Sequence, residues 1–364
     1  MTVYRSRGTS VPRLTSIPQV GPDRRALIVY TSGTTGRPKG VVSTHGNVEA
    51  QVSSLVTAWE WTARDRTLLV LPLHHVHGII NVVWSAVAVG ATLEMLPQFD
   101  AERTWERLAS GEITVFTAVP TIYRRLIQSW EAAPANVREQ RSEGSRRARL
   151  MMSGSAALPV SLLERWRDIT GQTLLERYGM TELGMALSNP LRGERRPGHV
   201  GRPLPLVETR LVDSELEVRG PNVFREYWGR PEETAAAFHD GWFRTGDVAV
   251  EEDGSYRLLG RISVDIIKTG GYKVSALEIE EVVREHPAVA DCAVVGCEDE
   301  EWGERVCAAV EIRAGQTLDL GALQNWTRPR LAPYKIPRVL RCVDALPRNA
   351  MGKVVKPEVK RIFT

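Results

Sequence analysis

The sequence that decides the fold is YTSGTTGRPKG, residues 30–40, which directly follows a short apolar run. Gly33 and Gly36 carry no side chain, so their backbone N–H groups can closely approach the oxygens of a bound anion. Lys39 adds a positive charge, and together these features suit a triphosphate. Further donors are the hydroxyl groups of Thr31, Ser32, Thr34 and Thr35. The segment therefore predicts a phosphate-binding loop at the end of a strand.

The spacing excludes a P-loop of the kinase and ATPase kind. That motif needs four residues between its first glycine and a Gly-Lys pair, and then a Ser or Thr for magnesium. Here Gly40 follows Lys39 instead. Taken alone, a loop rich in Gly, Ser and Thr is also typical of a flexible connection, so further motifs must decide between the two interpretations.

Several further motifs follow the loop along the chain. They are SGSAA at 153–157, YGMTE at 178–182, TGD at 245–247, GR at 260–261 and PRNAMGK at 347–353. With the loop, they closely resemble the ordered motifs of the adenylate-forming superfamily, which includes acyl-CoA synthetases, luciferases and the adenylation domains of peptide synthetases. The resemblance extends over nearly everything after residue 25. It implies a large N-terminal domain followed by a small C-terminal one.

Composition and charge are those of an ordinary soluble globular protein. Of the 364 residues, 43% are apolar and 25% are charged, and at about 100 to 200 residues per domain this length indicates more than one domain. The longest apolar stretch, residues 79–93, is interrupted by polar residues and is shorter than the ~20 residues of a membrane-spanning helix. The net charge is +3 with both signs interspersed, so we expect no nucleic-acid or membrane partner. The arginine-rich stretch 141–149 is interpreted as a solvated loop.

The four cysteines, Cys292, Cys297, Cys307 and Cys342, include no Cys-x-x-Cys pair. They indicate neither a metal site nor a disulfide framework, and so favour a reducing intracellular compartment. The sequence does not decide between the cytoplasm and the mitochondrial matrix. The first 22 residues carry arginines and hydroxyl groups and no acid, which is weakly typical of a mitochondrial transit peptide. A frayed terminus is the simpler explanation of that composition.

Apolar strands alternate with helices between residues 26 and 181. The expected strands are 26–30, 67–71, 92–96, 114–118, 148–152 and 173–175, and the expected helices are 47–59, 101–109, 121–132 and 159–169. This alternation predicts an α/β fold with a mostly parallel sheet covered on both faces. Ligands bind at the carboxyl ends of such strands, and we expect the phosphate loop to lie at such an end.

The pattern changes after residue 197. Short strands and a hairpin turn at Asp253-Gly254 predict a β-rich subdomain over about 198–261. A compact α+β module follows, in which Ser275 and Glu278 predict a capping box at the start of a helix. We therefore expect a disordered or residual segment at 1–25, an AMP-binding domain at 26–261, and a mobile C-terminal domain at 262–364.

Adenylation attaches a good leaving group to a carboxylate, and it needs cations and donors that stabilise charge while the reactants are held in line. The resemblance implies that Lys353, Thr181 and Glu182 are catalytic, with Lys353 at the α-phosphate of ATP and Glu182 helping to hold Mg²⁺. It also implies that Asp247 and Arg261 bind the ribose. Further nucleotide contacts are implied for Thr31, Ser32, Gly33, Thr34, Thr35, Gly36, Lys39, Gly154, Ser155, Ala156, Tyr178, Gly179 and Met180.

Coenzyme A is the acceptor that the resemblance implies for a second step. The family rotates its C-terminal domain between the steps, which moves Lys353 away and brings a glycine-containing turn to the pantetheine tunnel. The residues implied there are Gly270, Gly271, Tyr272 and Lys273. Ser263 corresponds to the hinge position, where relatives carry Asp or Lys. No carrier-protein segment is evident in the chain, so we favour transfer to coenzyme A.

Two arginines flank the expected acyl pocket, Arg125 in VPTIYRR and Arg177 in ERYGMTE. Burying a guanidinium is costly unless an anion meets it, so the arginines predict a substrate with a second carboxylate. These segments, with HHVHG at 74–78 and the stretch 188–198, closely resemble malonyl-CoA synthetases. The implied substrate-binding residues are His77, Arg125, Arg177 and Met185. The implied enzyme is an AMP- and pyrophosphate-forming acid–thiol ligase of fatty acid metabolism that makes malonyl-CoA or methylmalonyl-CoA.

Several alternatives stay open. Arg177 can pair with Glu176 instead of a substrate, and the substrate can be a monocarboxylic acid. The histidines at 74–77 suggest zinc, but they lack a matched second cluster of ligands. Only 29 residues precede Tyr30, whereas relatives have a long stretch there. We therefore expect an incomplete large domain, and a truncated paralogue or isoform that binds nucleotide with little or no activity is the alternative function.

Overall fold

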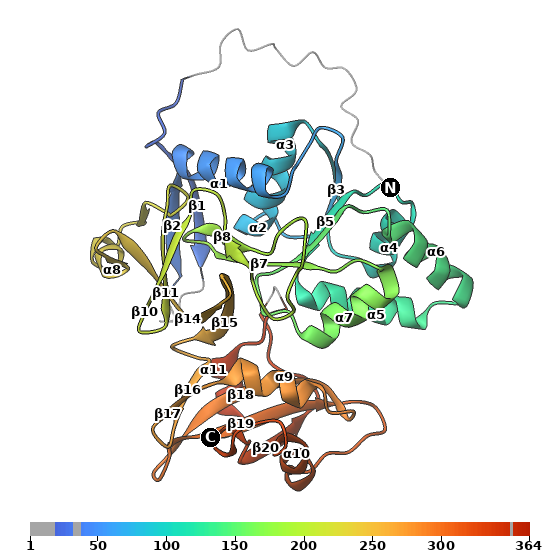
Figure 1. Ribbon diagram of the computed structural model, residues 1–364, viewed down its shortest axis with the longest axis vertical. Coiled ribbons are helices and arrows are strands. Elements are labelled where there is room, and N and C mark those ends of the chain that lie inside the picture. Colours follow the sequence, from blue (N-terminus) through green and yellow to red (C-terminus); the bar gives the residue numbers. More distant parts are fainter. Residues whose placement is uncertain (1–18, 32–37, 350–351) are drawn as a thin grey trace.

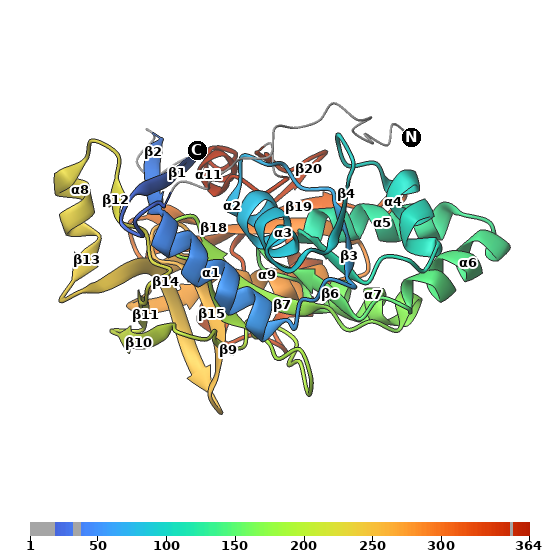
Figure 2. The ribbon, with the colours of Figure 1, turned by 90° about the horizontal axis from the view of Figure 1, so that it is seen from above.

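The computed structural model describes residues 19–31, 38–349 and 352–364. They form a large domain followed by a smaller one (Figure 1). In two perpendicular views, α8 (Pro231–Ala236) lies at one end of the large domain, and α4 (Ala101–Ala109) and α6 (Ala135–Ser145) lie at the other (Figures 1 and 2). The predicted fold class, an α/β domain with a small α+β domain after it, is confirmed.

A seven-stranded sheet forms the centre of the large domain. Its strands are β3 (Arg66–Leu69), β4 (Thr92–Met95), β5 (Val115–Ala118), β6 (Leu150–Ser153), β7 (Leu175–Met180), β8 (Gly184–Ser188) and β9 (Arg202–Pro203). The order is β4-β3-β5-β6-β7-β8-β9, in which β4 to β7 run parallel and the last two pairs are antiparallel. The connecting helices are α2 (Val76–Gly78), η1 (Ile79–Trp84), α3 (Ser85–Val89), α4, α5 (Pro120–Ala132), α6 and α7 (Val160–Thr170). The predicted alternation is thus confirmed.

Aromatic side chains fill the space between this sheet and its helices. Trp105 of α4, Tyr123 of α5 and Trp166 of α7 are completely buried. The ring centre of Trp166 lies 5.5 Å from that of Trp105 and 4.8 Å from that of Tyr123. Tyr123 also donates a 2.8 Å hydrogen bond to the carbonyl of Met152 on β6. These contacts fix α5 firmly on the sheet.

The first strand lies outside the seven-stranded sheet, so the prediction that the phosphate loop lies at the end of a parallel strand is wrong. β1 (Arg25–Thr31) pairs antiparallel with β2 (Lys39–Thr44), and β12 (Glu226–Tyr227) completes a three-stranded sheet. Thr31 and Lys39 lie opposite each other at the end of this hairpin. A parallel connection needs about a dozen residues or more, so the short stretch between these two residues suits a hairpin instead. α1 then follows β2 and spans His45–Ala58.

The arginine-rich stretch is not the solvated loop that we predict from its charge. Its first residues belong to α6, and Arg141 is buried. Arg141 pairs with Glu102 of α4 and donates a 3.0 Å hydrogen bond to the carbonyl of Ser129 on α5. Its guanidinium also lies 5.8 Å from the ring centre of Trp105. A paired arginine and a solvated arginine look alike in a sequence, so charge density alone could not distinguish them.

A β-rich part follows the central sheet. Its strands are β10 (Glu208–Val212), β11 (Glu215–Arg219), β13 (Phe238–His239), β14 (Trp242–Glu252) and β15 (Ser255–Arg261). The order is β10-β11-β14-β13, with β15 paired to β14. The predicted hairpin turn is confirmed, because Asp253 and Gly254 connect β14 to β15 with φ angles of 55° and 73°. This pairing sets Asp247 directly opposite Arg261.

The small domain has a five-stranded sheet of its own, ordered β17-β16-β19-β18 with β20 paired to β19. Its elements are β16 (Ile266–Thr269), β17 (Tyr272–Ser275), α9 (Ala276–Arg284), β18 (Val289–Asp299), β19 (Gly303–Ile312), α10 (Leu320–Thr327), η2 (Pro333–Lys335), β20 (Val339–Val343) and α11 (Lys356–Arg361). Ser275 Oγ caps α9 by accepting a 3.2 Å hydrogen bond from the Glu278 N–H. The Glu278 carboxylate instead pairs with Lys335 at 2.6 Å, so only half of the predicted capping box forms.

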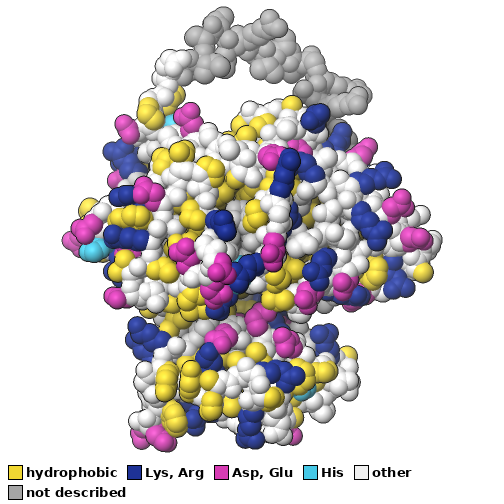
Figure 3. Space-filling model, in the orientation of Figure 1, with side chains coloured by type: hydrophobic (Ala, Val, Ile, Leu, Met, Phe, Trp, Pro, Cys, Tyr) yellow, Lys and Arg dark blue, Asp and Glu magenta, His cyan; other side chains and the backbone are white. Residues whose placement is uncertain are grey.

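Basic and acidic side chains are interspersed over the face of the molecule seen in Figure 3. The outline narrows where the large domain meets the small one (Figure 3). In the described part of the chain, no helix combines the length and the apolar character that crossing a membrane requires.

Candidate active site

Three segments meet at the side chain of Asp247. This carboxylate accepts a 2.6 Å hydrogen bond from the Tyr178 hydroxyl on β7 and a 3.0 Å hydrogen bond from Nε of Arg261 on β15. Burial raises the pKa of Tyr178, and the charge of Asp247 raises it further. Although burial opposes it, the bond to Asp247 raises the pKa of Arg261. The predicted ribose-binding pair therefore forms one charged cluster with Tyr178.

The segment that carries Lys353 reaches this cluster from the small domain. Two hydrogen bonds link described residues of this segment: the Lys353 N–H donates to Asn349 Oδ1 at 3.0 Å, and the Asn349 N–H donates to the Lys353 carbonyl at 2.9 Å. Lys353 is exposed, yet nearby protein atoms partly desolvate its ammonium. That desolvation and the positive charge of Arg261 lower the pKa of Lys353, while Asp247 acts in the opposite direction. The structure thus sets a cation within electrostatic reach of the Asp247–Arg261 pair.

Glu182 is buried in the turn after β7. It accepts a 3.1 Å hydrogen bond from the Tyr227 hydroxyl. Lys39 lies over the same tyrosine ring, 4.9 Å from its centre, and pairs with Glu233 of α8 at 2.8 Å. Burial raises the pKa of Glu182, although the charges of Arg261 and Lys39 oppose the shift. Two residues predicted to act at the phosphates therefore contact one tyrosine that the sequence did not single out.

The Glu182 carboxylate fits a magnesium ion that arrives with its nucleotide. Within residues 19–31, 38–349 and 352–364, no group of three or more His, Cys, Asp and Glu side chains is arranged to hold a metal ion. Mg²⁺ is usually bound through one or two carboxylates together with substrate phosphates and water, so a single carboxylate suits that role. The same finding gives no support to zinc at the histidines of 74–77.

The turn after β6 presents the predicted adenine-contacting residues Gly154, Ser155 and Ala156. Ser155 has a φ of 68°, an uncommon conformation for a residue with a side chain. Its hydroxyl lies 3.1 Å from Nδ1 of His77. Backbone outliers of this kind gather at binding sites, where the surrounding structure holds them in place. This turn therefore connects the predicted nucleotide residues with the predicted acyl pocket.

Arg177 is almost completely buried on β7, directly before Tyr178. Its Nη2 contacts Nε2 of His77, while Nε and Nη1 have no hydrogen-bond partner in the described part of the chain. Burial lowers the pKa of Arg177 to about 10, so the guanidinium stays charged at neutral pH. Leaving a buried charge without partners is costly. An anion in the pocket would remove that cost.

Glu176 does not act as the missing partner. One of its carboxylate oxygens accepts a 3.2 Å hydrogen bond from the Leu158 N–H, and the other has no partner among the described residues. Burial raises the pKa of Glu176 to about 8, with a contribution from the nearby charge of Glu281. The group is therefore largely protonated at neutral pH and supplies little charge to neutralise Arg177.

His77 orients the guanidinium of Arg177. It is buried at the start of the helix after β3, and Thr117 Oγ1 of β5 lies 2.8 Å from its Nε2. Burial and the charge of Arg177 hold the pKa of His77 well below its usual range, so the imidazole is neutral. Because Nε2 faces the Arg177 donor, Nδ1 carries the proton and donates to Ser155. His77 and Arg177 are thus brought together, as a shared acyl pocket requires.

The structure does not bring Arg125 to this pair. Arg125 is exposed on α5, and its guanidinium lies 5.4 Å from the ring centre of Phe99. The helix explains why Arg125 is exposed. Successive side chains of an α-helix point in directions about 100° apart, and Tyr123 and Leu126 occupy the buried face. Arg125 instead lines a cavity of about 1010 Å³ between the domains. Its role in binding the substrate stays a prediction.

The other predicted residues fall into four groups. Ser32, Gly33, Thr34, Thr35 and Gly36 lie outside the described residues. Met185 is buried and its N–H donates a 2.6 Å hydrogen bond to Gln51. Met180 ends β7 and Thr181 begins the turn with Glu182, and both are half-buried; a side chain at Gly179 would lie 1.9 Å from the carbonyl of Gly184. Gly270 and Gly271 form the turn between β16 and β17, and Tyr272 and Lys273 begin β17; none of the four lines the cavity between the domains.

Sequence reasoning missed Thr117 of β5, and it assigned no role to Ser153, the first residue of the SGSAA motif at the end of β6. Both are polar residues in otherwise apolar strands. Both are buried, and the Ser153 hydroxyl has no partner among the described residues. A polar residue within a fully buried strand is a signal that could have found them, because such groups need a partner. Tyr227 carries no comparable signal, since its contact with Glu182 depends on the tertiary fold.

The comparison with protein families gives two matches. The AMP-binding enzyme family matches residues 4–228. The AMP-binding enzyme C-terminal domain matches residues 278–353. A mitochondrial malonate–CoA ligase of Mus musculus is 52% identical over 374 residues, and this match covers 93% of the present chain and 64% of the relative. The chain therefore spans less than two thirds of that relative's length.

Two solved structures are similar to this chain over more than nine tenths of its length. ATP-bound MatB from Rhodopseudomonas palustris is 37% identical with a TM-score of 0.88, and the match covers 94% of this chain and 69% of that one. A malonyl-CoA ligase in a ternary product complex with methylmalonyl-CoA and AMP is 43% identical with a TM-score of 0.64, covering 92% and 74% of the two chains. The more similar sequence thus gives the poorer superposition.

Proposed function

Because the chain belongs to the AMP-binding enzyme family, we propose that it is an ATP-dependent ligase that converts malonate or methylmalonate into its coenzyme A thioester through an acyl-adenylate. The observation that carries this proposal is the buried guanidinium of Arg177, with two nitrogens that lack partners among the described residues. The names of the mouse relative and of the product complex support the same substrate class. We place the reaction inside the cell, and the mouse relative favours mitochondria.

The second carboxylate of the substrate explains the pocket. A monocarboxylic acid with an apolar tail would leave Arg177 charged, buried and unpaired. A dicarboxylic acid uses one carboxylate for the reaction and offers the other to the guanidinium, where a charge-assisted hydrogen bond forms in a low-dielectric setting. His77 contacts Nη2 of the guanidinium, and Nε and Nη1, which no described residue binds, are available to the substrate.

In the first step, the reacting carboxylate attacks the α-phosphorus of ATP and pyrophosphate leaves. Lys353 approaches the Asp247–Arg261 pair, so an ATP whose ribose binds Asp247 has its α-phosphate close to this ammonium. The lysine then stabilises negative charge as it builds up on the phosphate and aligns the two anions. Mg²⁺, held through Glu182 and the phosphates, would supply further positive charge for the departing pyrophosphate.

In the second step, the thiol of coenzyme A attacks the acyl carbonyl and AMP leaves. The turn of Gly270 and Gly271 has positive φ angles and an exposed Tyr272, so its backbone can closely approach a ligand. A rotation of the small domain must bring it to the acyl-adenylate, because it does not line the cavity between the domains here. The better superposition on the ATP-bound relative than on the product complex supports the view that this structure has the arrangement of the first step.

The order of the two steps is tested by following both products. We expect malonate-dependent release of pyrophosphate from ATP without coenzyme A, and thioester only when coenzyme A is present. Pyrophosphate release is measured by a coupled assay and the thioester by mass spectrometry. Formation of ADP and phosphate, or thioester without AMP, would contradict the proposed adenylate. Binding of ATP without any acid-dependent release would favour a nucleotide-binding protein instead.

A further inference from the structure

Helix α5 of the large domain contacts the segment that carries Lys353. Arg124 Nη1 of α5 lies 2.7 Å from Oδ2 of Asp291 on β18 of the small domain. A Cβ atom placed on Gly352 would lie 3.0 Å from Oγ1 of Thr121, so the first turn of α5 also packs against the backbone next to Lys353. Thr121 and Arg124 are three residues apart, and therefore face the same side of the helix.

Asp291 links Arg124 to the segment that carries Lys353. Its Oδ2 also accepts a 2.5 Å hydrogen bond from Nη2 of Arg348, and Nη1 of Arg348 donates a 3.1 Å hydrogen bond to the carbonyl of Gly352. One chain of charge-assisted bonds therefore runs from Arg124 through Asp291 and Arg348 to the residue before Lys353. We call these residues, Arg124, Asp291 and Arg348, the interdomain chain.

Asp291 is held ionised and oriented by its neighbours. Asp291 is buried, yet the guanidinium groups of Arg124 and Arg284 overcome the effect of burial and hold the pKa of its carboxyl well below the usual range. Arg284 donates a 3.2 Å hydrogen bond to Oδ1 of Asp291, and the Cys292 N–H donates another at 2.9 Å. Because these bonds lie within the small domain, Asp291 stays oriented when Arg124 is removed.

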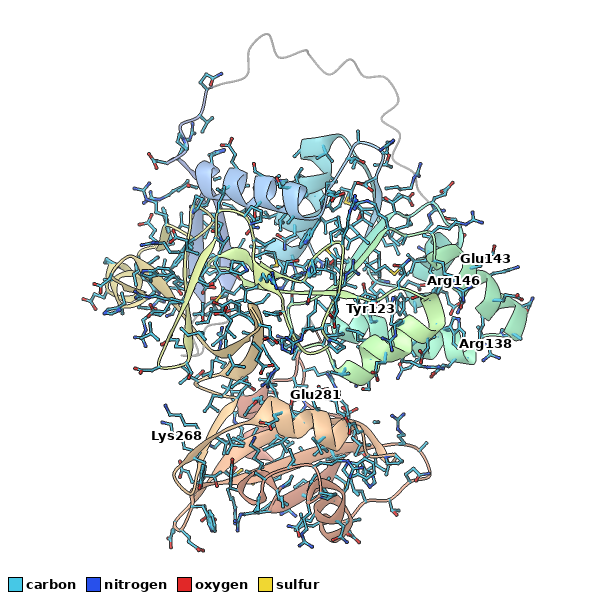
Figure 4. The ribbon with its side chains drawn as sticks, in the orientation of Figure 1. Tyr123, Arg138, Glu143, Arg146, Lys268 and Glu281 are labelled. Carbon is cyan, nitrogen blue, oxygen red and sulfur yellow. The ribbon has the colours of Figure 1, made fainter. Side chains whose placement is uncertain are left out.

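A further bond between the domains lies beside this chain. Glu281 of α9 accepts a 3.1 Å hydrogen bond from the Val160 N–H at the start of α7. Figure 4 shows Glu281 on the side of the small domain that faces the large one. The donor in this bond is the backbone N–H of Val160, and its acceptor, Glu281, belongs to the small domain. Among the described contacts named here, the Arg124–Asp291 pair is the one with a charged side chain of the large domain, so Arg124 is chosen for the test.

We propose that Arg124 is a positioning residue for the first half-reaction: through Asp291 and Arg348 it holds the Lys353 segment beside the Asp247–Arg261 pair. The bond between Arg124 and Asp291 must break when the small domain rotates, because its two ends belong to different domains. Arg124 therefore favours the arrangement for adenylation and opposes the arrangement for thioester formation. This inference rests on the proposed two-step function.

The kinetic test compares Arg124→Ala with two other variants. Arg124→Lys keeps the charge, and Arg165→Ala removes an arginine whose ion pair with Glu131, at 2.8 Å, lies within the large domain. For Arg124→Ala we expect malonate-dependent pyrophosphate release to fall about 5- to 50-fold, while thioester formation from supplied malonyl-adenylate is unchanged or faster. Arg124→Lys should recover part of the loss, and Arg165→Ala should match the native chain. Equal loss in both half-reactions, or no loss beyond that of Arg165→Ala, would overturn the proposal.

A distance measurement tests the same inference without turnover. Spin labels are placed at Glu143→Cys on α6 and Lys268→Cys on β16, both exposed and far apart in Figure 4, after the exposed Cys342 is replaced by serine. Pulsed electron spin resonance then gives the distribution of distances between the domains. We expect Arg124→Ala to lower the population of the distance in the present structure by about tenfold relative to other arrangements. An unchanged distribution would overturn the positioning role, whatever acid the protein activates.

Discussion

Replacing Arg177 by alanine is expected to lower kcat/KM for malonate by about 200- to 5,000-fold, because breaking a buried charge pair costs about 3 to 5 kcal/mol. The native guanidinium is buried, charged and held by His77, and two of its nitrogens have no hydrogen-bond partner in the part of the chain that the structure describes. Removing it leaves the distal carboxylate of malonate without a partner in a water-poor pocket. The loss should appear in steady-state kinetics with malonate as the varied substrate.

The affinity for ATP separates this loss from general damage. The Kd for ATP should stay within about threefold of the native value, since Arg177 is not among the groups that we assign to the nucleotide. Gly154→Ala should also lower malonate activity, because a Cβ atom at Gly154 would lie 2.2 Å from Nη1 of Arg177 and displace the guanidinium. It is not a control for ATP binding, since Gly154 is among the residues that we assign to the nucleotide. Retention of full malonate activity by Arg177→Ala would rule out the substrate role of this residue.

Lys353→Ala is expected to reduce adenylation by about 10²- to 10³-fold or more, the loss typical when one donor to a developing negative charge is removed. Desolvation and Arg261 lower the pKa of Lys353 from its usual value, so they make its charged form less favourable, while Asp247 opposes this. The triphosphate of ATP would add a further favourable interaction with the ammonium. Malonate-dependent ATP–pyrophosphate exchange measures the effect directly.

Thioester formation from supplied malonyl-adenylate serves as the internal control for Lys353→Ala. In the proposed cycle the small domain carries this lysine away before coenzyme A reacts, so the second half-reaction should continue at close to the native rate. Equal loss of both half-reactions would overturn the assignment of Lys353 to the first step. Arg348, which belongs to the same segment as Lys353, is not a suitable control because it is part of the interdomain chain.

Features whose signal lies in neighbouring residues could be predicted from the sequence. The hairpin turn at Asp253-Gly254 and the helix cap at Ser275 depend on local backbone preferences, and both are present. The parallel sheet follows from regular alternation of strands and helices. The proximity of Asp247 and Arg261 follows from the same hairpin, because the turn fixes which residues of its two strands lie opposite each other.

Features that depend on distant partners could not be predicted in the same way. The place of β1 in a separate sheet depends on its pairing with β2, and the burial of Arg141 depends on Glu102. In the sequence, nothing distinguishes Asp291 from an ordinary strand residue, because its ion pair is with Arg124 of the other domain. The position of Arg125 is different, because the helical repeat around Tyr123 could have shown that Arg125 points away from the core.

Substrate choice is the central claim, and ATP–pyrophosphate exchange with a panel of acids tests it most directly. The panel contains malonate, methylmalonate, acetate, a medium-chain fatty acid and a coumarate-like acid, each at saturating ATP and without coenzyme A. Because two nitrogens of the buried Arg177 guanidinium have no partner among the described residues, we predict that malonate or methylmalonate supports exchange with a kcat/KM about 10²-fold or more above each monocarboxylic acid. A monocarboxylic acid that supports exchange better than both dicarboxylic acids would contradict the account.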